Sequence, residues 1–141
     1  MYNAGIMSYA WGAGILLADQ WSKRTIQTCG ANRHLGWGAA VRFRFAAHRH
    51  RSYEQTGARV ALVLTWVLAL LCGVTLHRFG AWFQGATSLA GLGLALGGAA
   101  SNLLDILRCR YVIDFIDLGW WPVFNLADVA ILAGLAAAFL G

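Results

Sequence analysis

The chain has 141 residues, of which 59% are hydrophobic and only 12% charged, with a formal net charge of +5. Soluble domains contain about 45–50% apolar and about 25% charged residues. A water-soluble globular fold of this composition would lack the charged surface that it needs. The length is that of a single domain, and the composition indicates lipid as its main solvent.

Four long runs are almost free of Asp, Glu, Lys and Arg: residues 1–18, 60–76, 79–104 and 118–141, the last interrupted by Asp128. A membrane-spanning helix needs about 20 apolar residues, with a range of about 17–25. We predict an all-α membrane protein with four transmembrane helices, at about residues 2–19, 59–77, 82–106 and 122–140. Pro122 suits the first turn of the last helix. The alternative is a soluble protein with a buried helical core.

The first run could also be interpreted as a cleaved signal peptide. It lacks a basic start, and Asp19 and Gln20 follow it instead of a small-residue cleavage site. We therefore expect a retained helix, and a single domain over residues 1–141.

Two polar segments, residues 20–58 and 107–121, separate these helices and should lie on one side of the membrane. Residues 41–45 alternate apolar and basic side chains, and residues 111–117 are rich in β-branched and aromatic ones. Both patterns are typical of strands. We predict that the two segments pair into a small sheet; the alternative is two unrelated interfacial loops. Within the third helix, the spacing of Gly93 and Gly97 favours close helix packing.

Metal ligands are not indicated by the sequence. Cys29, Cys72 and Cys109 are widely spaced, and His48 and His50 lie in a basic stretch. We predict neither a disulfide framework nor a metal site.

The basic residues are unevenly distributed. Eight of the eleven Lys and Arg lie between Lys23 and Arg59, and Arg108 and Arg110 lie in the second polar segment, which leaves only Arg78 on the other side. The positive-inside rule would place both polar segments in the cytoplasm.

The few acidic residues carry most of the chemical information. A carboxylate at membrane depth costs about 2.5–3.5 kcal/mol on insertion scales, so it needs a role or a partner. Asp105 and Asp128 each follow an asparagine by three residues, Asn102 and Asn125, which on a helix could orient them. Two adjacent carboxyls can share a proton and activate water, as in aspartyl proteases. Helix caps, or ion or proton transport, explain the same residues.

Three blocks in the C-terminal half resemble the lipoprotein signal peptidases, also called signal peptidase II. They are Gly-Gly-Ala-Ala-Ser-Asn-Leu-Leu-Asp (97–105), Tyr-Val-Ile-Asp-Phe (111–115) and Trp-Pro-Val-Phe-Asn-Leu-Ala-Asp-Val-Ala-Ile (121–131). Asp-Gln-Trp-Ser-Lys (19–23) is similar to that family's first motif. The likeness covers most of the chain.

This resemblance implies four transmembrane helices, a small extracytoplasmic β-cradle and cleavage of a signal peptide before a lipid-modified cysteine. It implies a catalytic pair, Asp114 and Asp128. The supporting residues that it implies are Asp19, Lys23, Asn102, Asp105 and Asn125. It also implies no metal or organic cofactor, and a monomer in the bacterial inner membrane that meets lipids and lipidated precursors but no nucleic acid.

The chain departs from the family in two places. The family continues its third block with Asp-Arg, whereas Ile106 follows Asp105 here, and Arg108 or Arg110 could substitute. The family's Asn-x-Gly-Ala-Ala-Phe is replaced by residues 36–41, so its Asn and Phe are missing. We therefore keep open a catalytically altered paralogue that binds lipidated or membrane-anchored peptides, and a small ion- or proton-coupled transporter.

The family topology contradicts the charge rule, and we follow the family because its motifs are more specific. Arginines of the outer segment could then hold anionic headgroups or an acidic substrate; the alternative, which we favour slightly, is that they are solvated at a strand edge and in a loop. The candidates are Arg42, Arg44, Arg49 and Arg51.

Overall fold

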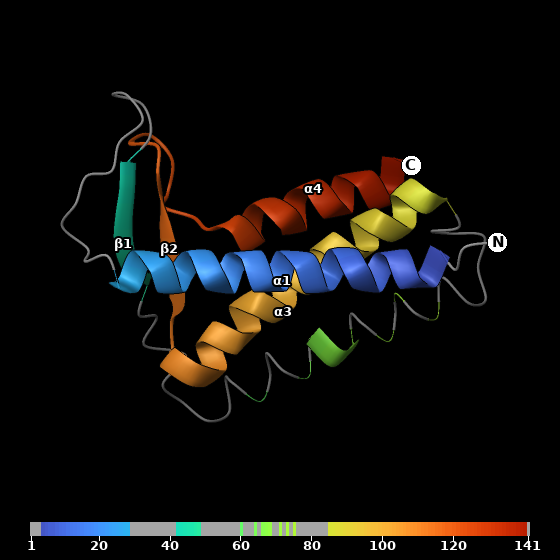
Figure 1. The fold of residues 1–141 in the computed structure, drawn as a ribbon, viewed down its shortest axis with the longest axis horizontal. Coiled ribbons are helices and arrows are strands. Elements are labelled where there is room, and N and C mark those ends of the chain that lie inside the picture. Colours follow the sequence, from blue (N-terminus) through green and yellow to red (C-terminus); the bar gives the residue numbers. More distant parts are fainter. Residues whose placement is uncertain are drawn as a thin grey trace.

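The computed structural model describes residues 4–28, 42–48 (backbone only) and 85–140, together with isolated positions between 60 and 75. Its elements are α1 (Ala4–Thr28), β1 (Arg42–His48), α3 (Ala86–Cys109), β2 (Val112–Asp117) and α4 (Leu126–Leu140). Figure 1 shows α1 and α4 along the long axis of the view, α3 crossing α1 obliquely, and the two strands at one end. Positions 60, 64, 66–68, 71, 73 and 75 are helical within the predicted second helix, whose remainder lies outside the described residues.

Helix α3 packs between α1 and α4, and its glycines make this possible. Gly97 lies against the backbone of Gly12 in α1, and Gly93 lies against Ser8 one turn earlier, so the predicted glycine spacing does serve helix packing. On another face, a Cβ placed on Gly98 would come within 2.6 Å of the Ala127 carbonyl oxygen in α4. Any side chain there would push the start of α4 away from α3.

Helix α1 ends at Thr28, nine residues later than predicted, because polar residues continue it on the side that packs against α3. Asp19 and Lys23 are four residues apart, share one face and are almost completely buried. The hydroxyls of Ser22, Thr25 and Thr28 donate to carbonyls one turn back, which satisfies them within the helix. The first polar segment therefore starts as helix, and Asp19 lies well inside α1 rather than at its end.

Helix α4 starts at Leu126, four residues later than predicted, because the preceding chain pairs with β2. The Phe124 amide donates to the Ile116 carbonyl at 3.0 Å, and its carbonyl accepts from the Phe115 and Ile116 amides at 3.0 and 2.8 Å. Pro122 consequently lies outside the helix, and the prediction that it lies in the first turn was wrong. The predicted start at residue 122 would place Asp128 nearly two turns inside the helix, whereas Asp128 lies in the first turn of α4.

Strands β1 and β2 pair antiparallel in a two-stranded sheet, as the two strand-like segments predicted. Arg42 pairs with Asp117, Ala46 with Asp114 and His48 with Val112, with an irregularity between Phe43 and Ala46. The sheet lies where α1 and α3 end and α4 begins (Figure 1). This arrangement places a strand directly beside the polar residues of three helices.

The outer faces of the helices are apolar. Leu17 of α1 and Leu132 and Phe139 of α4 are 66%, 70% and 64% exposed. Within the described residues, α3 is the one helix that is both long and apolar enough to cross a membrane, and α4 is apolar but shorter, at 15 residues. The molecule is thus mostly helical, with a small sheet at one end.

Candidate active site

A cluster of buried polar side chains lies at the sheet end of the bundle. Asp19, Lys23, Ser101, Asp105, Asp114 and Asn125 are all at most 7% exposed, and Asn102 and Asp128 are half-buried beside them. All seven residues predicted from the sequence belong to one continuous network of hydrogen bonds and ion pairs. Three helices and one strand contribute to it, although these residues span more than a hundred positions of the chain.

Lys23 holds α1 and α3 together at the base of the cluster. Its ammonium lies 2.5 Å from Asp19 Oδ2 and 2.7 Å from Asp105 Oδ2, and it donates to Asn102 Oδ1 at 3.0 Å. An ammonium has three N–H donors and no acceptor, so these three oxygens satisfy it completely. A lysine that is 1% exposed is therefore stable here only because two carboxylates and an amide face it.

The two carboxylates beside Lys23 also fix the neighbouring elements. Asp19 Oδ1 accepts the Ala127 amide at 3.0 Å, in the first turn of α4, where helices leave amides without partners. Asp105 Oδ2 accepts the Ile113 amide at 3.3 Å, at the start of β2. One buried ion-pair network thus sets the positions of α4 and β2 relative to α1 and α3.

Ser101 and Gln20 belong to the network, and the sequence analysis missed both. The Ser101 hydroxyl donates to Asp19 Oδ2 at 2.7 Å, and the Gln20 amide donates to Ser101 Oγ at 3.0 Å and to Asp105 Oδ1 at 2.8 Å. Their positions could have revealed them, because Ser101 precedes Asp105 by one helical turn and Gln20 directly follows Asp19.

Asn125 and Asp128 form a reciprocal cap at the start of α4. The Asn125 side-chain oxygen accepts the Asp128 amide at 2.9 Å, and Asp128 Oδ2 accepts the Asn125 amide at 3.1 Å. This is the capping-box arrangement, in which the N-cap residue and the third helical residue satisfy each other's amides. The Asn-x-x-Asp pattern therefore works through the helix start, and not through one helix face as the sequence suggested.

Asn125 and Asn102 connect the two candidate catalytic carboxyls. Asn125 Nδ2 donates to Asp114 Oδ1 at 2.8 Å and to Asn102 Oδ1 at 3.1 Å. Asn102 Nδ2 donates to Asp128 Oδ1 at 2.8 Å, and not to Asp105 as its spacing had suggested. Because Asn102 Oδ1 already accepts from Lys23, the amide orientation is fixed and its NH₂ group must face Asp128.

Asp114 and Asp128 reach the cluster from different elements and differ in exposure. Asp114 lies in the middle of β2 between the buried Ile113 and Phe115, and is 7% exposed. Asp128 is half-buried, and both its carboxyl oxygens accept N–H donors. Strand β2 and the start of α4 thus bring Asp114 and Asp128, which are 14 positions apart in the sequence, to the side chain of Asn125. Its Nδ2 donates to the Asp114 carboxyl, and its Oδ1 accepts the backbone amide of Asp128.

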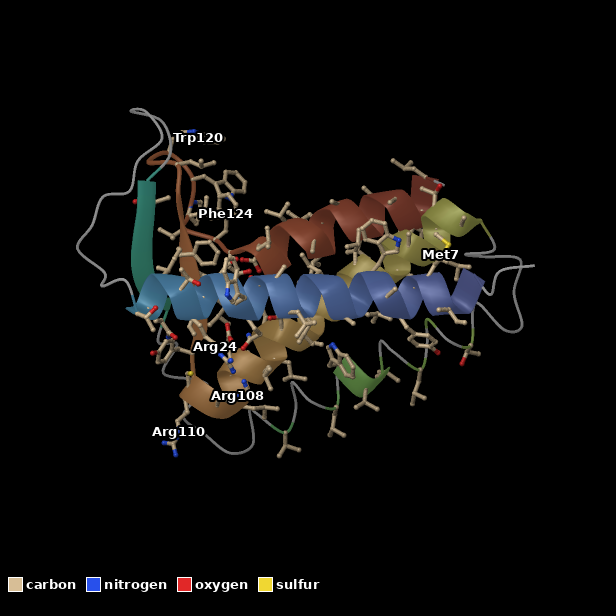
Figure 2. The ribbon with its side chains drawn as sticks, viewed as in Figure 1. Met7, Arg24, Arg108, Arg110, Trp120 and Phe124 are labelled. Carbon is tan, nitrogen blue, oxygen red and sulfur yellow. The ribbon has the colours of Figure 1, made fainter. Side chains whose placement is uncertain are left out.

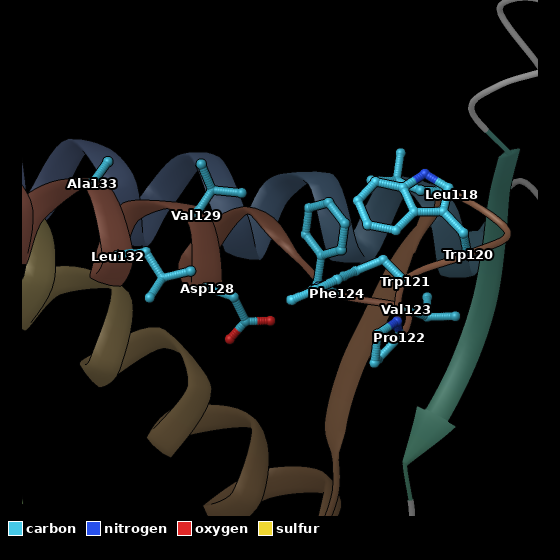
Figure 3. Close-up of a pocket in the computed structure, with 10 residues that line it drawn as sticks. All are labelled: Leu118, Trp120, Trp121, Pro122, Val123, Phe124, Asp128, Val129, Leu132 and Ala133. Atoms are coloured by element: carbon cyan, nitrogen blue, oxygen red, sulfur yellow. The ribbon is translucent and has the colours of Figure 1, made fainter.

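An apolar pocket of about 620 Å³ opens beside Asp128 (Figure 3). Its walls come from the loop after β2 and from the outer face of α4. They are formed by Leu118, Trp120, Trp121, Pro122, Val123, Phe124, Val129, Leu132 and Ala133. Asp128 contributes the one carboxyl in this lining, and Figure 3 shows it between Leu132 of α4 and Phe124 of the loop. The pocket is therefore suited to an apolar chain whose reactive group reaches Asp128.

The two departures from the signal peptidase pattern have different outcomes. Ile106 is 6% exposed, so the position after Asp105 is filled by an apolar side chain. Arg108 and Arg110 are exposed, and neither makes an ion pair with a described carboxylate, so neither replaces an arginine at that position. Residues 36–41 lie outside the described residues, as do Arg49, His50, Arg51 and the side chains of Arg42 and Arg44.

No group of three or more His, Cys, Asp and Glu side chains in the described part of the chain could hold a metal ion. The carboxylates of the cluster instead pair with Lys23 or accept hydrogen bonds from amides.

Comparison with known proteins identifies the family. The sequence matches the family Signal peptidase (SPase) II over residues 12–141, and the chain belongs to this family. A lipoprotein signal peptidase of Syntrophomonas wolfei is 51% identical over 73 residues, which cover 50% of this chain and 48% of that protein. One of Rhodococcus jostii is 42% identical over 84 residues, covering 53% and 42% respectively. The matched regions span about half the length of these relatives or less.

The fold agrees with solved structures. Two structures described as bacterial membrane enzymes superpose with TM-scores of 0.79 and 0.80, over 94% of this chain and 85% and 90% of theirs. Their sequence identity is 18% in both cases, so the likeness concerns the fold alone.

Proposed function

We propose that this protein is an intramembrane aspartyl endopeptidase that cleaves signal peptides of prolipoproteins before a lipid-modified cysteine. One observation carries the proposal: Asn125 binds Asp114 with its side chain and Asp128 with its backbone, beside an apolar pocket. Two carboxyls held by a common asparagine, one of them lining an apolar pocket, fit acid–base hydrolysis of an amide. Membership of the signal peptidase II family supports the same reaction.

The carboxyls divide the reaction between them. Both oxygens of Asp128 accept N–H donors, which suits the ionised form, so we assign Asp128 as the base that takes a proton from water. The water oxygen attacks the carbonyl carbon of the scissile bond. Asp114, in its neutral form, supplies the proton to the leaving nitrogen as the C–N bond breaks. Asn102 and Asn125 keep both carboxyls in place during these transfers.

The pocket beside Asp128 indicates an apolar substrate. A pocket of about 620 Å³ with aromatic and aliphatic walls offers few polar partners to a hydrophilic peptide. A signal helix and an acyl group on the cysteine would both bury apolar surface against α4 and the loop after β2. The substrate's scissile carbonyl would then lie over the start of α4.

We further propose that the chain spans the bacterial inner membrane with four helices, with the sheet and the carboxyl cluster at the extracytoplasmic face. The exposed apolar side chains on α1 and α4 support a lipid environment, and the second helix of this arrangement rests on the sequence. Membrane lipids and lipidated precursors are the expected partners of a monomer that needs no metal or organic cofactor.

The test is cleavage of a synthetic prolipoprotein peptide carrying a diacylglyceryl cysteine by the purified protein in neutral detergent. Asp114→Asn and Asp128→Asn should each abolish product, because either change removes a group that must exchange a proton. Asp117→Asn is the matched control from the same strand; its side-chain oxygen can still accept the Gly119 amide, so activity should remain. Cleavage by Asp128→Asn at the wild-type rate would contradict the assignment.

A chelator control and an unlipidated peptide complete the experiment. Activity should survive EDTA, and the unlipidated peptide should be cleaved more slowly because it buries less apolar surface. Binding of the lipidated peptide without any product over long incubation would identify a non-catalytic relative instead. Proton or cation flux in liposomes without cleavage would identify a transporter.

A further inference from the structure

The charged side chains at the sheet end of the bundle are sorted by sign. The carboxyls of Asp19, Asp105 and Asp114 are buried, and Asp117 and Asp128 are half-buried. Among the described charged residues, the exposed ones are all arginines: Arg24, Arg108 and Arg110. The outward electric field of this part of the molecule is therefore positive, although its interior is rich in acid.

The three arginines lie at one level of the bundle. The ion pair between Lys23 and Asp105 fixes α1 against α3 at this height, and Arg24 directly follows Lys23. Arg108 lies in the last turn of α3, and Arg110 caps that helix in the left-handed conformation, with φ of 66°. Figure 2 shows all three near the sheet end, well separated from Trp120 and Phe124 beside the pocket.

Exposed apolar side chains accompany these arginines. Trp21, one turn of α1 before Arg24, is 71% exposed, and Leu107, next to Arg108, is 47% exposed. Basic and tryptophan side chains together are typical of the boundary between hydrocarbon and headgroups. No described carboxylate forms an ion pair with Arg24, Arg108 or Arg110, so the described part of the chain supplies no anion to these guanidinium groups.

We propose that Arg24, Arg108 and Arg110 form a binding surface for the phosphate headgroups of anionic phospholipids. A guanidinium presents paired N–H donors that match phosphate oxygens, and the surface lies apart from the peptidase pocket. The inference rests on the membrane placement in the proposed function, and adds to it a lipid partner at the level of the active site. It also explains why the sheet end of the bundle is basic although the proposed topology places it at the extracytoplasmic face. The positive charge there binds the headgroups of the outer leaflet.

The test is binding of a fluorescent phosphatidylglycerol to the purified full chain in dodecyl maltoside micelles, with phosphatidylcholine of the same acyl chains as comparison. Each arginine near an anionic lipid surface contributes about fivefold, which corresponds to about 1 kcal/mol. Arg108→Gln should therefore weaken phosphatidylglycerol binding by about fivefold. The triple variant Arg24→Gln/Arg108→Gln/Arg110→Gln should weaken it by about 100-fold, and neither should change phosphatidylcholine binding.

Two controls make the result decisive. Arg78→Gln removes one positive charge from the turn that the sequence places on the other side of the membrane, and it should leave binding unchanged. Raising the ionic strength should weaken binding by the wild type more than by the triple variant, because salt screens exposed charges. Equal phosphatidylglycerol binding by wild type and triple variant would overturn the proposal, as would an Arg78→Gln loss as large as that of Arg108→Gln. Displacement of the lipid by an acidic peptide at stoichiometric concentration would show a peptide site instead.

Peptidase activity separates this proposal from the one on which it rests. The triple variant should cleave the lipidated peptide at the wild-type rate in neutral detergent, because none of the three arginines forms an ion pair with a carboxylate of the cluster. If wild type binds phosphatidylglycerol as described but cleaves nothing, the proposed function fails and the lipid surface stands.

Discussion

Replacing Lys23 with methionine should destabilise the protein more than removing the positive charge of any other side chain that the structure describes. Lys23 is 1% exposed, and its partners Asp19 and Asp105 are 0% and 2% exposed. Methionine fills a similar volume, so the main effect is electrostatic: two carboxylates stay buried without their cation. Removing one partner of a buried ion pair costs about 3–5 kcal/mol, and with two partners affected we expect the upper part of this range.

The measurement is thermal unfolding in neutral detergent, followed by circular dichroism. For a chain of this size, about 2–4 °C of midpoint shift accompanies each kcal/mol, so the midpoint of Lys23→Met should fall by roughly 10 °C or more. Arg24→Met is the matched control, since it removes a cation from the next position of α1 but from an exposed side chain. Its free energy of unfolding should change by less than about 0.5 kcal/mol.

A double variant tests whether the carboxylates cause the loss. Adding Asp105→Asn to Lys23→Met removes one of the two uncompensated charges, while the asparagine oxygen can still accept from Gln20. The double variant should therefore be less destabilised than the sum of the two single changes, by about 0.5–3 kcal/mol of coupling energy. A Lys23→Met protein that unfolds within 1 kcal/mol of the wild type would refute the electrostatic reasoning.

Three further predictions concern the catalytic geometry, the helix packing and the pocket. Asn125→Ser keeps a helix-capping oxygen but is too short to reach the carboxyl of Asp114, so kcat in the peptide assay should fall by about 2–10-fold, the value of a hydrogen bond between neutral groups. An unchanged kcat would show that this bond does not matter. Gly98→Ala should lower the free energy of unfolding by about 1–3 kcal/mol, because its Cβ would overlap the Ala127 carbonyl oxygen in α4. Gly14→Ala is the control and should not lower it, because a Cβ there has nothing within 4 Å. Equal unfolding midpoints would contradict the packing argument. Ala133→Trp should fill the pocket and raise KM several-fold. Ala136→Trp should leave KM unchanged, because Ala136 is exposed on the same helix but lies outside the pocket lining. Equal KM values for the two variants would mean that the substrate binds elsewhere.

The sequence by itself determined which segments of this protein are apolar helices and which are strands. Its charge-free runs located most ends of α1, α3 and α4 to within a few residues. This was possible because the absence of charged residues over a helix-long run is visible in the sequence alone. The alternation at residues 41–45 and the β-branched run at 111–117 likewise identified both strands that pair. Carboxylates are so rare in apolar runs that Asp128 was conspicuous without any structure, whereas Asp114, in a polar segment, was assigned through the resemblance to the signal peptidases.

The tertiary structure decided how these residues act, because their partners are distant in sequence. Hydropathy ended α1 at Asp19, yet the helix continues to Thr28, since burial against α3 makes Lys23 compatible with it. Pairing of Phe124 with β2 delays α4 until Leu126, which moves Asp128 to the first turn and makes Asn125 a cap. Local spacing assigned Asn102 to Asp105, but contact between three helices directs its amide to Asp128. Which donor meets which acceptor depends on positions in space, and no pattern within one helix specifies these.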